Sequence, residues 1–156
     1  MATFEQAISG ASAGMESSDV FENIWVASTN GDLARVAEFL GSGVNVNAQD
    51  ENGFSPIHAA ASYGQLPLIE FLIGHSADVN LRDIDGDTPI LVCEDQTTFE
   101  LLERNGADIN AKNSEGFGLA ERAVALAEEE NEDMVTFLFN RGFLPVDFKV
   151  VQETVE

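Results

Sequence analysis

The sequence predicts an all-α solenoid, in which pairs of helices stack side by side and are linked by β-turn or hairpin loops. Two observations lead to this prediction. Short segments that share an asparagine recur, and this asparagine is found first at Asn47, then 33 residues on at Asn80, and 30 residues further on at Asn110. Amphipathic helical patterns fill the chain between these segments. A repeat of this length is typical of an array whose units bury their apolar sides against their neighbours.

Each recurring segment is followed by a turn that contains glycine. These turns span Asp50–Gly53, Asp83–Gly86 and Asn113–Gly116. Glycine readily adopts the positive φ that a tight turn needs, so we expect one loop of this kind per repeat. A second pair of glycines, Gly31 and Gly64, is also 33 residues apart and lies between two helical patterns.

The second copy is the most complete. Residues 55–64 read Ser-Pro-Ile-His-Ala-Ala-Ala-Ser-Tyr-Gly, and apolar residues follow at helical spacing. Ser55 is expected to be the N-cap of a helix, because Pro56 is tolerated in the first turn. These residues resemble the ankyrin repeat, which has a turn, a Thr-Pro-Leu-His opening and two antiparallel helices. The third copy opens in the same way, with Thr88 and Pro89.

The resemblance covers about residues 19–143 and implies four repeats, at about 19–49, 50–82, 83–112 and 113–143. Residues 1–18 are expected to be a flexible segment. The tail, residues 144–156, either packs on the last helix pair or is a linear motif for a partner. In ankyrin arrays the turn tips and the first helix of each repeat line one concave face, whose side chains are free for recognition.

The first and last copies depart from the ankyrin pattern, as terminal repeats are expected to do. Asp19 and Glu22 predict a capping-box start for a helix over Val20–Ser28 in the first copy. The fourth copy inserts the acidic run Glu128–Asp133 between its helices.

The third copy is shortened, because three residues are missing between its helices. Its second helix is expected to begin with Thr97 as N-cap, followed three residues on by Glu100, and to bury Phe99 and Leu102. The shortening creates either a notch for a partner or a weak joint.

The composition is strongly acidic, with 28 Asp and Glu against 7 Lys and Arg and a net charge of −21. This charge repels nucleic acids and anionic membranes, so we expect neither as a partner. It attracts a basic protein, or else it serves solubility alone. The best apolar stretch, Leu66–Ile73, is too short to span a bilayer, and no disulfide framework is possible with one cysteine. We expect a monomer in the cytoplasm, the nucleus or both.

Catalysis is not expected, and neither is a cofactor. His58, His75 and Cys93 are the only residues from which a nucleophilic centre could be built. The resemblance places His58 in the repeat's histidine position, where the ring links neighbouring turns, and Cys93 where a small buried residue belongs. His75 is expected to be exposed.

A metal site is not expected either. The run Asp83–Asp87, with Glu94 in twelfth position, has the acidic spacing of a calcium-binding loop. The sixth position of such a loop requires glycine, but here it is Thr88, and Pro89 follows. We interpret the run as an acidic turn between repeats.

Protein binding is therefore the function that the sequence favours. The register of the repeat places Thr29 and Asn30 on the concave face in the first copy. In the later copies it gives a candidate set of Glu51, Asn52, Phe54, Ser62, Tyr63, Ile84, Asp85, Asp87, Glu115 and Phe117. Phe54, Ile84 and Phe117 are expected to be exposed anchors at successive loop tips, within an acidic rim. The alternative is that Phe54 and Phe117 are not exposed anchors but fold back on their own turns.

Three hypotheses follow for the partner. The first is an adaptor or regulator that binds a partner protein on the concave face and turn tips. The second is an acidic escort for a basic client, such as a ribosomal protein or a histone. The third is enzyme inhibition, because four copies resemble the small ankyrin inhibitors of cyclin-dependent kinases. In that family the second copy is the shortened one, whereas here it is the third.

Overall fold

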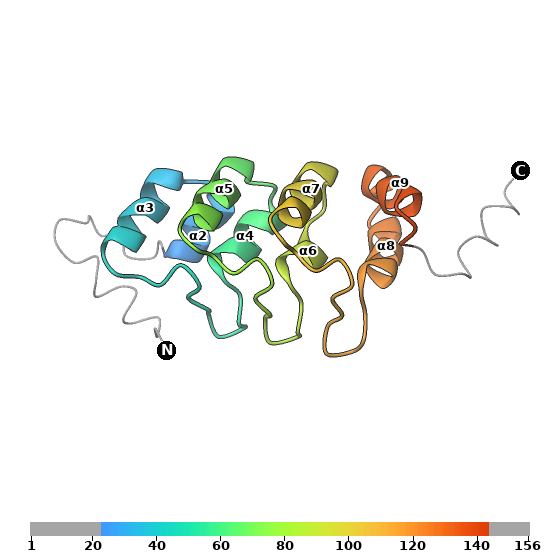
Figure 1. The fold of residues 1–156 in the computed structure, drawn as a ribbon, viewed down its shortest axis with the longest axis horizontal. Coiled ribbons are helices and arrows are strands. Elements are labelled where there is room, and N and C mark those ends of the chain that lie inside the picture. Colours follow the sequence, from blue (N-terminus) through green and yellow to red (C-terminus); the bar gives the residue numbers. More distant parts are fainter. Residues whose placement is uncertain (1–22, 144–156) are drawn as a thin grey trace, which may run out of the picture.

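The computed structural model describes residues 23–143, which form four helix pairs in a row (Figure 1). The pairs are α2 (Ile24–Asn30) with α3 (Leu33–Gly41), α4 (Pro56–Ser62) with α5 (Leu66–Gly74), α6 (Pro89–Val92) with α7 (Gln96–Arg104), and α8 (Leu119–Glu128) with α9 (Glu132–Asn140). This part of the chain contains helices and no strand, so the predicted all-α solenoid is confirmed. The predictions for residues 1–18 and 144–156 lie outside the described residues.

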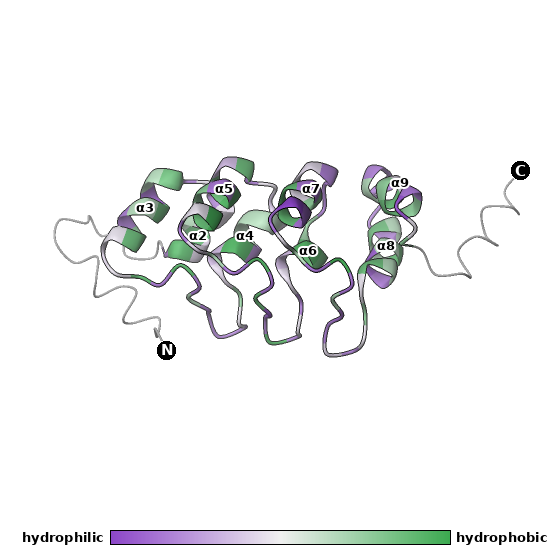
Figure 2. Cartoon of the chain, in the orientation of Figure 1, coloured by the Kyte–Doolittle hydropathy of each residue, from purple (hydrophilic) through white to green (hydrophobic). Residues whose placement is uncertain are grey.

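The helices form two rows, with the loops extending to one side (Figure 1). Helices α2, α4 and α6 pack side by side in the inner row, and α3, α5, α7 and α9 follow one another in the outer row. The core lies between the rows and repeats with the sequence. Fully or almost fully buried positions recur as Ile24, Ile57 and Ile90 on the inner helices and as Phe39, Leu72, Leu102 and Leu138 on the outer ones. Figure 2 shows hydrophobic segments on the helices of both rows and hydrophilic stretches along the loops.

The loops have a common hydrogen-bond pattern. The Oδ1 atom of Asp83 accepts the backbone N–H groups of Asp85 and Asp87, at 2.9 Å each. Asp50 and Asn113 make the same pair of bonds in their own loops. Because a side chain closes each turn, the loop keeps a fixed shape without pairing as a strand.

Successive loops are also joined to each other. The N–H of Ile84 donates to the carbonyl of Asn52, and the N–H of Ser114 donates to the carbonyl of Asp85, at 2.9 Å each. Gly53 lies at this contact with a φ of +72°, and a Cβ atom there would lie 2.7 Å from the backbone nitrogen of Ile84. Glycine is therefore required both for the turn and for the approach of the next loop.

The recurring asparagines link one repeat to the next. The Oδ1 atom of Asn47 accepts the N–H of Asp78, and that of Asn80 accepts the N–H of Asp108, at 2.8 Å each. The period that identified the repeat in the sequence is therefore the period of a hydrogen bond between neighbouring units.

Two predicted helix starts are wrong. Helix α2 begins at Ile24 rather than at Val20, because Asn23 has extended backbone and its side chain caps the N–H of Val26. Asp19 and Glu22 lie outside the described residues. Helix α7 is capped by Asp95 and not by Thr97, since the carboxylate of Asp95 accepts the N–H of Thr98 at 2.8 Å.

Other local predictions are confirmed. Ser55 is the N-cap of α4, with Pro56 in the first turn. Phe99 and Leu102 are fully buried in α7, although that helix begins one residue earlier than Thr97.

Candidate protein-binding surface

Two of the three predicted anchor residues at the loop tips, Ile84 and Phe117, are exposed, and so is Tyr63 of the candidate set. The exposed fraction is 68% for Ile84, 66% for Tyr63 and 49% for Phe117. Ile84 and Phe117 belong to successive loops, each of which leads into the N-terminal end of an inner helix, whereas Tyr63 is the C-cap of α4 and lies at the opposite end of that helix. Four predicted polar residues are exposed as well, namely Glu51, Asn52, Asp85 and Glu115. Large apolar side chains in water beside carboxylates are typical of a protein interface.

Phe54 is an exception, and the prediction that it is an exposed anchor is wrong. Its ring is half-buried and lies 5.2 Å from the imidazole of His58, centroid to centroid. The ring therefore folds back on its own repeat. The same alternative does not hold for Phe117, half of whose surface is exposed.

Two predicted polar residues already have partners within the fold. The hydroxyl of Ser62 donates to the carbonyl of His58 at 3.0 Å, and the carboxylate of Asp87 accepts from the amide of Asn113 at 3.1 Å. Both side chains are partly buried. They are still accessible in part, because both line the hollow described next.

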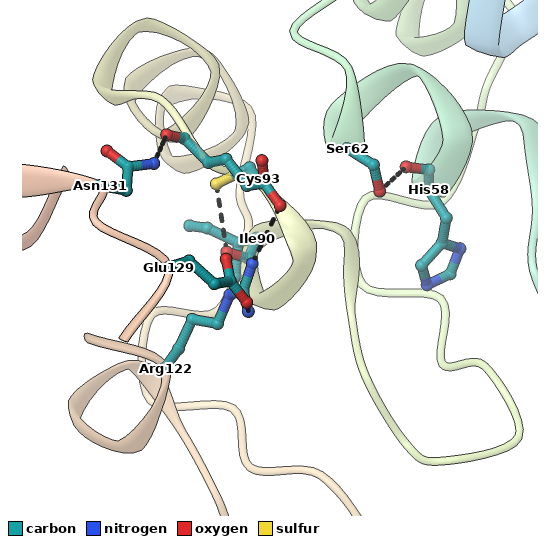
Figure 3. Close-up of polar contacts among 8 residues, drawn as sticks. His58, Ser62, Ile90, Cys93, Arg122, Glu129 and Asn131 are labelled. Atoms are coloured by element: carbon teal, nitrogen blue, oxygen red, sulfur yellow. Dashed lines mark hydrogen bonds and ion pairs between the residues drawn. The ribbon is translucent and has the colours of Figure 1, made fainter. Parts of the chain in front are cut away.

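A hollow of about 370 Å³ connects the loop tips to the inner helices, and we refer to it as the notch. Its apolar lining consists of Leu91 and Val92 from α6, Ala125 from α8, and Phe117 from the last loop. Ser62 of α4 also lines it, so the notch extends from the second repeat to the fourth. Figure 3 shows Ser62 on one side and Arg122 with Glu129 on the other, around the chain that follows α6.

The notch follows from the shortened third repeat. Helix α6 has four residues, whereas the inner helices α2 and α4 have seven each. Cys93, at the position where α6 would continue, already has an extended backbone. The missing helical turn leaves space between α4 and α8. Sequence reasoning found the deletion that causes the notch but missed the lining residues Leu91, Val92, Glu94, Glu121, Arg122 and Ala125.

The charged residues of the notch are mostly acidic. Asp87, Glu94 and Glu121 line it together with one cation, Arg122. Arg122 is paired already, with Glu94 at 3.3 Å and with Glu129 at 3.5 Å (Figure 3). The notch therefore presents more negative than positive charge to an incoming group.

The protonation of two of these carboxyls is shifted by their surroundings. The N–H of Gly118 donates to Glu121 at 2.8 Å, and this bond lowers the pKa of the Glu121 carboxyl. Burial raises the pKa of the Asp87 carboxyl, against the effect of the bond from Asn113.

The comparison with protein families decides what kind of protein this is. A family model of ankyrin repeats, in three copies, matches residues 24–113, which is more than half of the chain. The chain belongs to the ankyrin-repeat family. Ankyrin repeats are protein–protein interaction modules. The fourth helix pair, α8 with α9, follows the matched segment. A search of curated proteins found no match to the chain.

His58 occupies the ankyrin histidine position and has the linking role expected there. Its Nδ1 atom lies 2.7 Å from the hydroxyl of Ser55, and its Nε2 atom lies 2.9 Å from the carbonyl of Asp87 in the next loop. Since a carbonyl can only accept, Nε2 carries the proton and Nδ1 accepts from Ser55. Burial lowers the pKa of His58, which favours this neutral form.

Cys93 also fills a structural position of the ankyrin repeat. Its side chain is fully buried, its thiol donates to the carbonyl of Ile90, and burial raises the pKa of the thiol to about 12. A thiol with such a pKa is a poor nucleophile at neutral pH. His75 is exposed, as predicted. No helix among the described residues is long and apolar enough to cross a bilayer.

Proposed function

We propose that this ankyrin protein is an adaptor or regulator that binds a partner protein across its loop tips and inner helices. The observation that carries the proposal is the exposure of Tyr63, Ile84 and Phe117, which have no packing role that explains their size. Exposed carboxylates accompany Ile84 and Phe117 on the same loops, and Phe117 also lines the notch. An apolar centre with a polar rim is the usual anatomy of such an interface.

The test is capture of the partner by a variant that carries Tyr63→Ala, Ile84→Ala and Phe117→Ala. We expect the variant to keep the helical circular dichroism of the wild type and to lose most of the capture, because exposed anchors contribute to binding and little to folding. The matched control carries Leu33→Ala and Phe139→Ala, which remove exposed apolar side chains from the outer helices α3 and α9. Equal capture by wild type and triple variant rejects the proposal.

An acidic escort for basic clients is the second candidate, and the net charge of −21 favours it. The run Glu128–Asp133 adds five acidic residues that are all exposed, at the junction of α8 and α9. An escort of this kind binds through many weak charge contacts. Its binding to basic clients should therefore weaken steeply between low and physiological salt, where charges are screened beyond ~8 Å. Salt-independent binding contradicts this role.

A further inference from the structure

We infer that the notch is a docking pocket for an arginine side chain of the partner protein. This inference rests on the proposed function, because it names the chemistry of the partner at one part of the same surface. It goes beyond the anchors at the loop tips, since the notch exists only where the third repeat is shortened.

The shape of the notch fits a long side chain with an apolar stem. Val92 and Ala125 line it from α6 and α8, and Leu91 is almost fully buried beside them. An arginine stem that enters between the two helices would bury its methylene groups against these side chains. Phe117 lies at the rim with half of its surface exposed. A guanidinium group can stack on such a ring.

The charges of the notch select a cation. Asp87, Glu94 and Glu121 line it, and the positive charge of Arg122 is shared between Glu94 and Glu129. Asp87 is partly buried, and a carboxylate in such a place interacts with a ligand more strongly than one on an open surface, because less water screens it. The guanidinium group combines planarity, stacking and several donors, so arginine suits this lining better than lysine does.

The charge of the chain argues against two other occupants. A second copy of the protein also carries −21, and the two copies repel each other. The chain's own tail, residues 144–156, has one lysine and three acidic residues, so it does not complement an acidic recess. A basic segment of a different protein is the occupant that the charges favour.

The first test uses a blocked pentapeptide with a central arginine between glycines, titrated into the isotope-labelled protein and followed by NMR. The expected result is that amide shifts concentrate on residues 91–94 and 117–125. The same peptide with citrulline, which keeps the shape of arginine but lacks its charge, should bind about tenfold more weakly. The affinity of the lysine peptide should lie between those of the arginine and citrulline peptides. Shifts spread over all acidic loops, or equal binding of citrulline, overturn the inference.

The second test blocks the notch. Ala125→Arg places a long cation in it, and the matched control Ala34→Arg makes the same change at an exposed position of α3. We expect Ala125→Arg to lower the affinity for the arginine peptide about tenfold and Ala34→Arg to have little effect on it. Equal weakening by both variants indicates diffuse attraction and overturns the inference.

A milder pair keeps the test valid if Ala125→Arg fails to fold. Glu94→Gln removes one charge from the notch, and Glu70→Gln removes one from an exposed position of α5. Only Glu94→Gln should weaken the binding of the arginine peptide. If neither notch variant affects the peptide while the triple alanine variant still loses its partner, the proposed function stands and this inference fails.

Discussion

One residue distinguishes the loop contacts of the second and third repeats. His58 accepts a hydrogen bond from the hydroxyl of Ser55, but the equivalent residue of the third repeat is Leu91. The hydroxyl of Thr88, which corresponds to Ser55, is therefore buried and finds no hydrogen-bond partner among residues 23–143. A buried hydroxyl without a partner destabilises the folded state, whereas a paired one stabilises it.

The two hydroxyls should consequently respond to removal in opposite ways. Thr88→Val is expected to raise the free energy of unfolding by about 1 kcal/mol, because it removes an unpaired polar group at nearly constant volume. Ser55→Ala should lower it by about 1 kcal/mol or more, since it removes a helix cap and the partner of His58. Urea unfolding of both variants measures this. A loss of stability in both variants contradicts the assignment of the Thr88 hydroxyl as a buried group without a hydrogen-bond partner.

His58 gives the protein a pH dependence. Burial lowers the pKa of His58 below its usual 6.5, so the unfolded chain binds a proton below that pH before the folded chain does. Stability is then greatest above pH 6.5 and falls as the pH drops through 6.5, by at most about 1.4 kcal/mol per pH unit. Urea unfolding between pH 7.5 and 5.5 checks this in a His75→Gln background, where His58 is the only imidazole. His58→Asn should lack the fall; an equal fall in that variant excludes His58 as its cause.

At the level of the helix pairs, the turn that joins the first helix of a pair to the second also differs between repeats. Gly31 and Gly64 have φ values of +71° and +64° there. Glu130 occupies the same place between α8 and α9 with a φ of +61°. The backbone bonds agree as well, because Gln65 donates to Ala60 and Asn131 donates to Leu126 in the same pattern. A side chain in the left-handed region costs roughly 1–2 kcal/mol, so this junction is strained.

Glu130→Gly should therefore raise the free energy of unfolding by about 1 kcal/mol, net of the greater freedom of glycine in the unfolded chain. Glu130→Gln is the matched control, since it removes the charge and keeps the strained side chain. Thermal unfolding should show a clear gain for Gly and a smaller one for Gln. Equal melting temperatures for the two variants would show that the gain comes from removing the charge and not from relieving backbone strain at residue 130.

The repeats and their core could be predicted from the sequence because they depend on spacing. The turn glycines and Ser55 act through local backbone geometry, and the recurring asparagines Asn47 and Asn80 bind the same place in the next repeat, so all of them recur with the period of the array. The caps Asn23 and Asp95 were missed because several polar residues precede each helix and only the backbone conformation decides among them.

The site could be predicted less well than the fold. Exposure of Phe54 depends on a ring contact with His58, which the register alone does not reveal. The notch depends on how α4 and α8 lie after the deletion, a relation between residues far apart in the chain. The sequence therefore indicated the exposure of Ile84 and Phe117 correctly and left the residues between the helices unassigned.

Across the whole molecule, the joint between the third and fourth repeats differs from the others. It is hollowed at the notch and again between α7 and α9, where a recess of about 640 Å³ lies. Ion pairs cross it, from Arg122 to Glu94 and from Arg141 to Glu103, and the amide of Asn131 donates to the carbonyl of Glu94. Polar contacts thus take part in holding this joint together.

Salt should stabilise the array as a whole. Partly exposed ion pairs such as those of Arg122 and Arg141 contribute about 0–1 kcal/mol each, so their screening costs little. The repulsion among 28 acidic residues with a net charge of −21 is spread over the molecule, and screening relieves it. The melting temperature is expected to rise between low and moderate sodium chloride. A flat or falling curve means that the ion pairs outweigh the repulsion.

The central claim is that the partner contacts the loop tips and inner helices rather than the outer helices. A photoreactive phenylalanine analogue in place of Phe117 or Phe139 tests it directly, since the two residues are 49% and 36% exposed and lie on the loop side and on α9 respectively. Irradiation with the bound partner should give a covalent adduct from position 117 and little from position 139. An adduct from position 139 alone would contradict the claim.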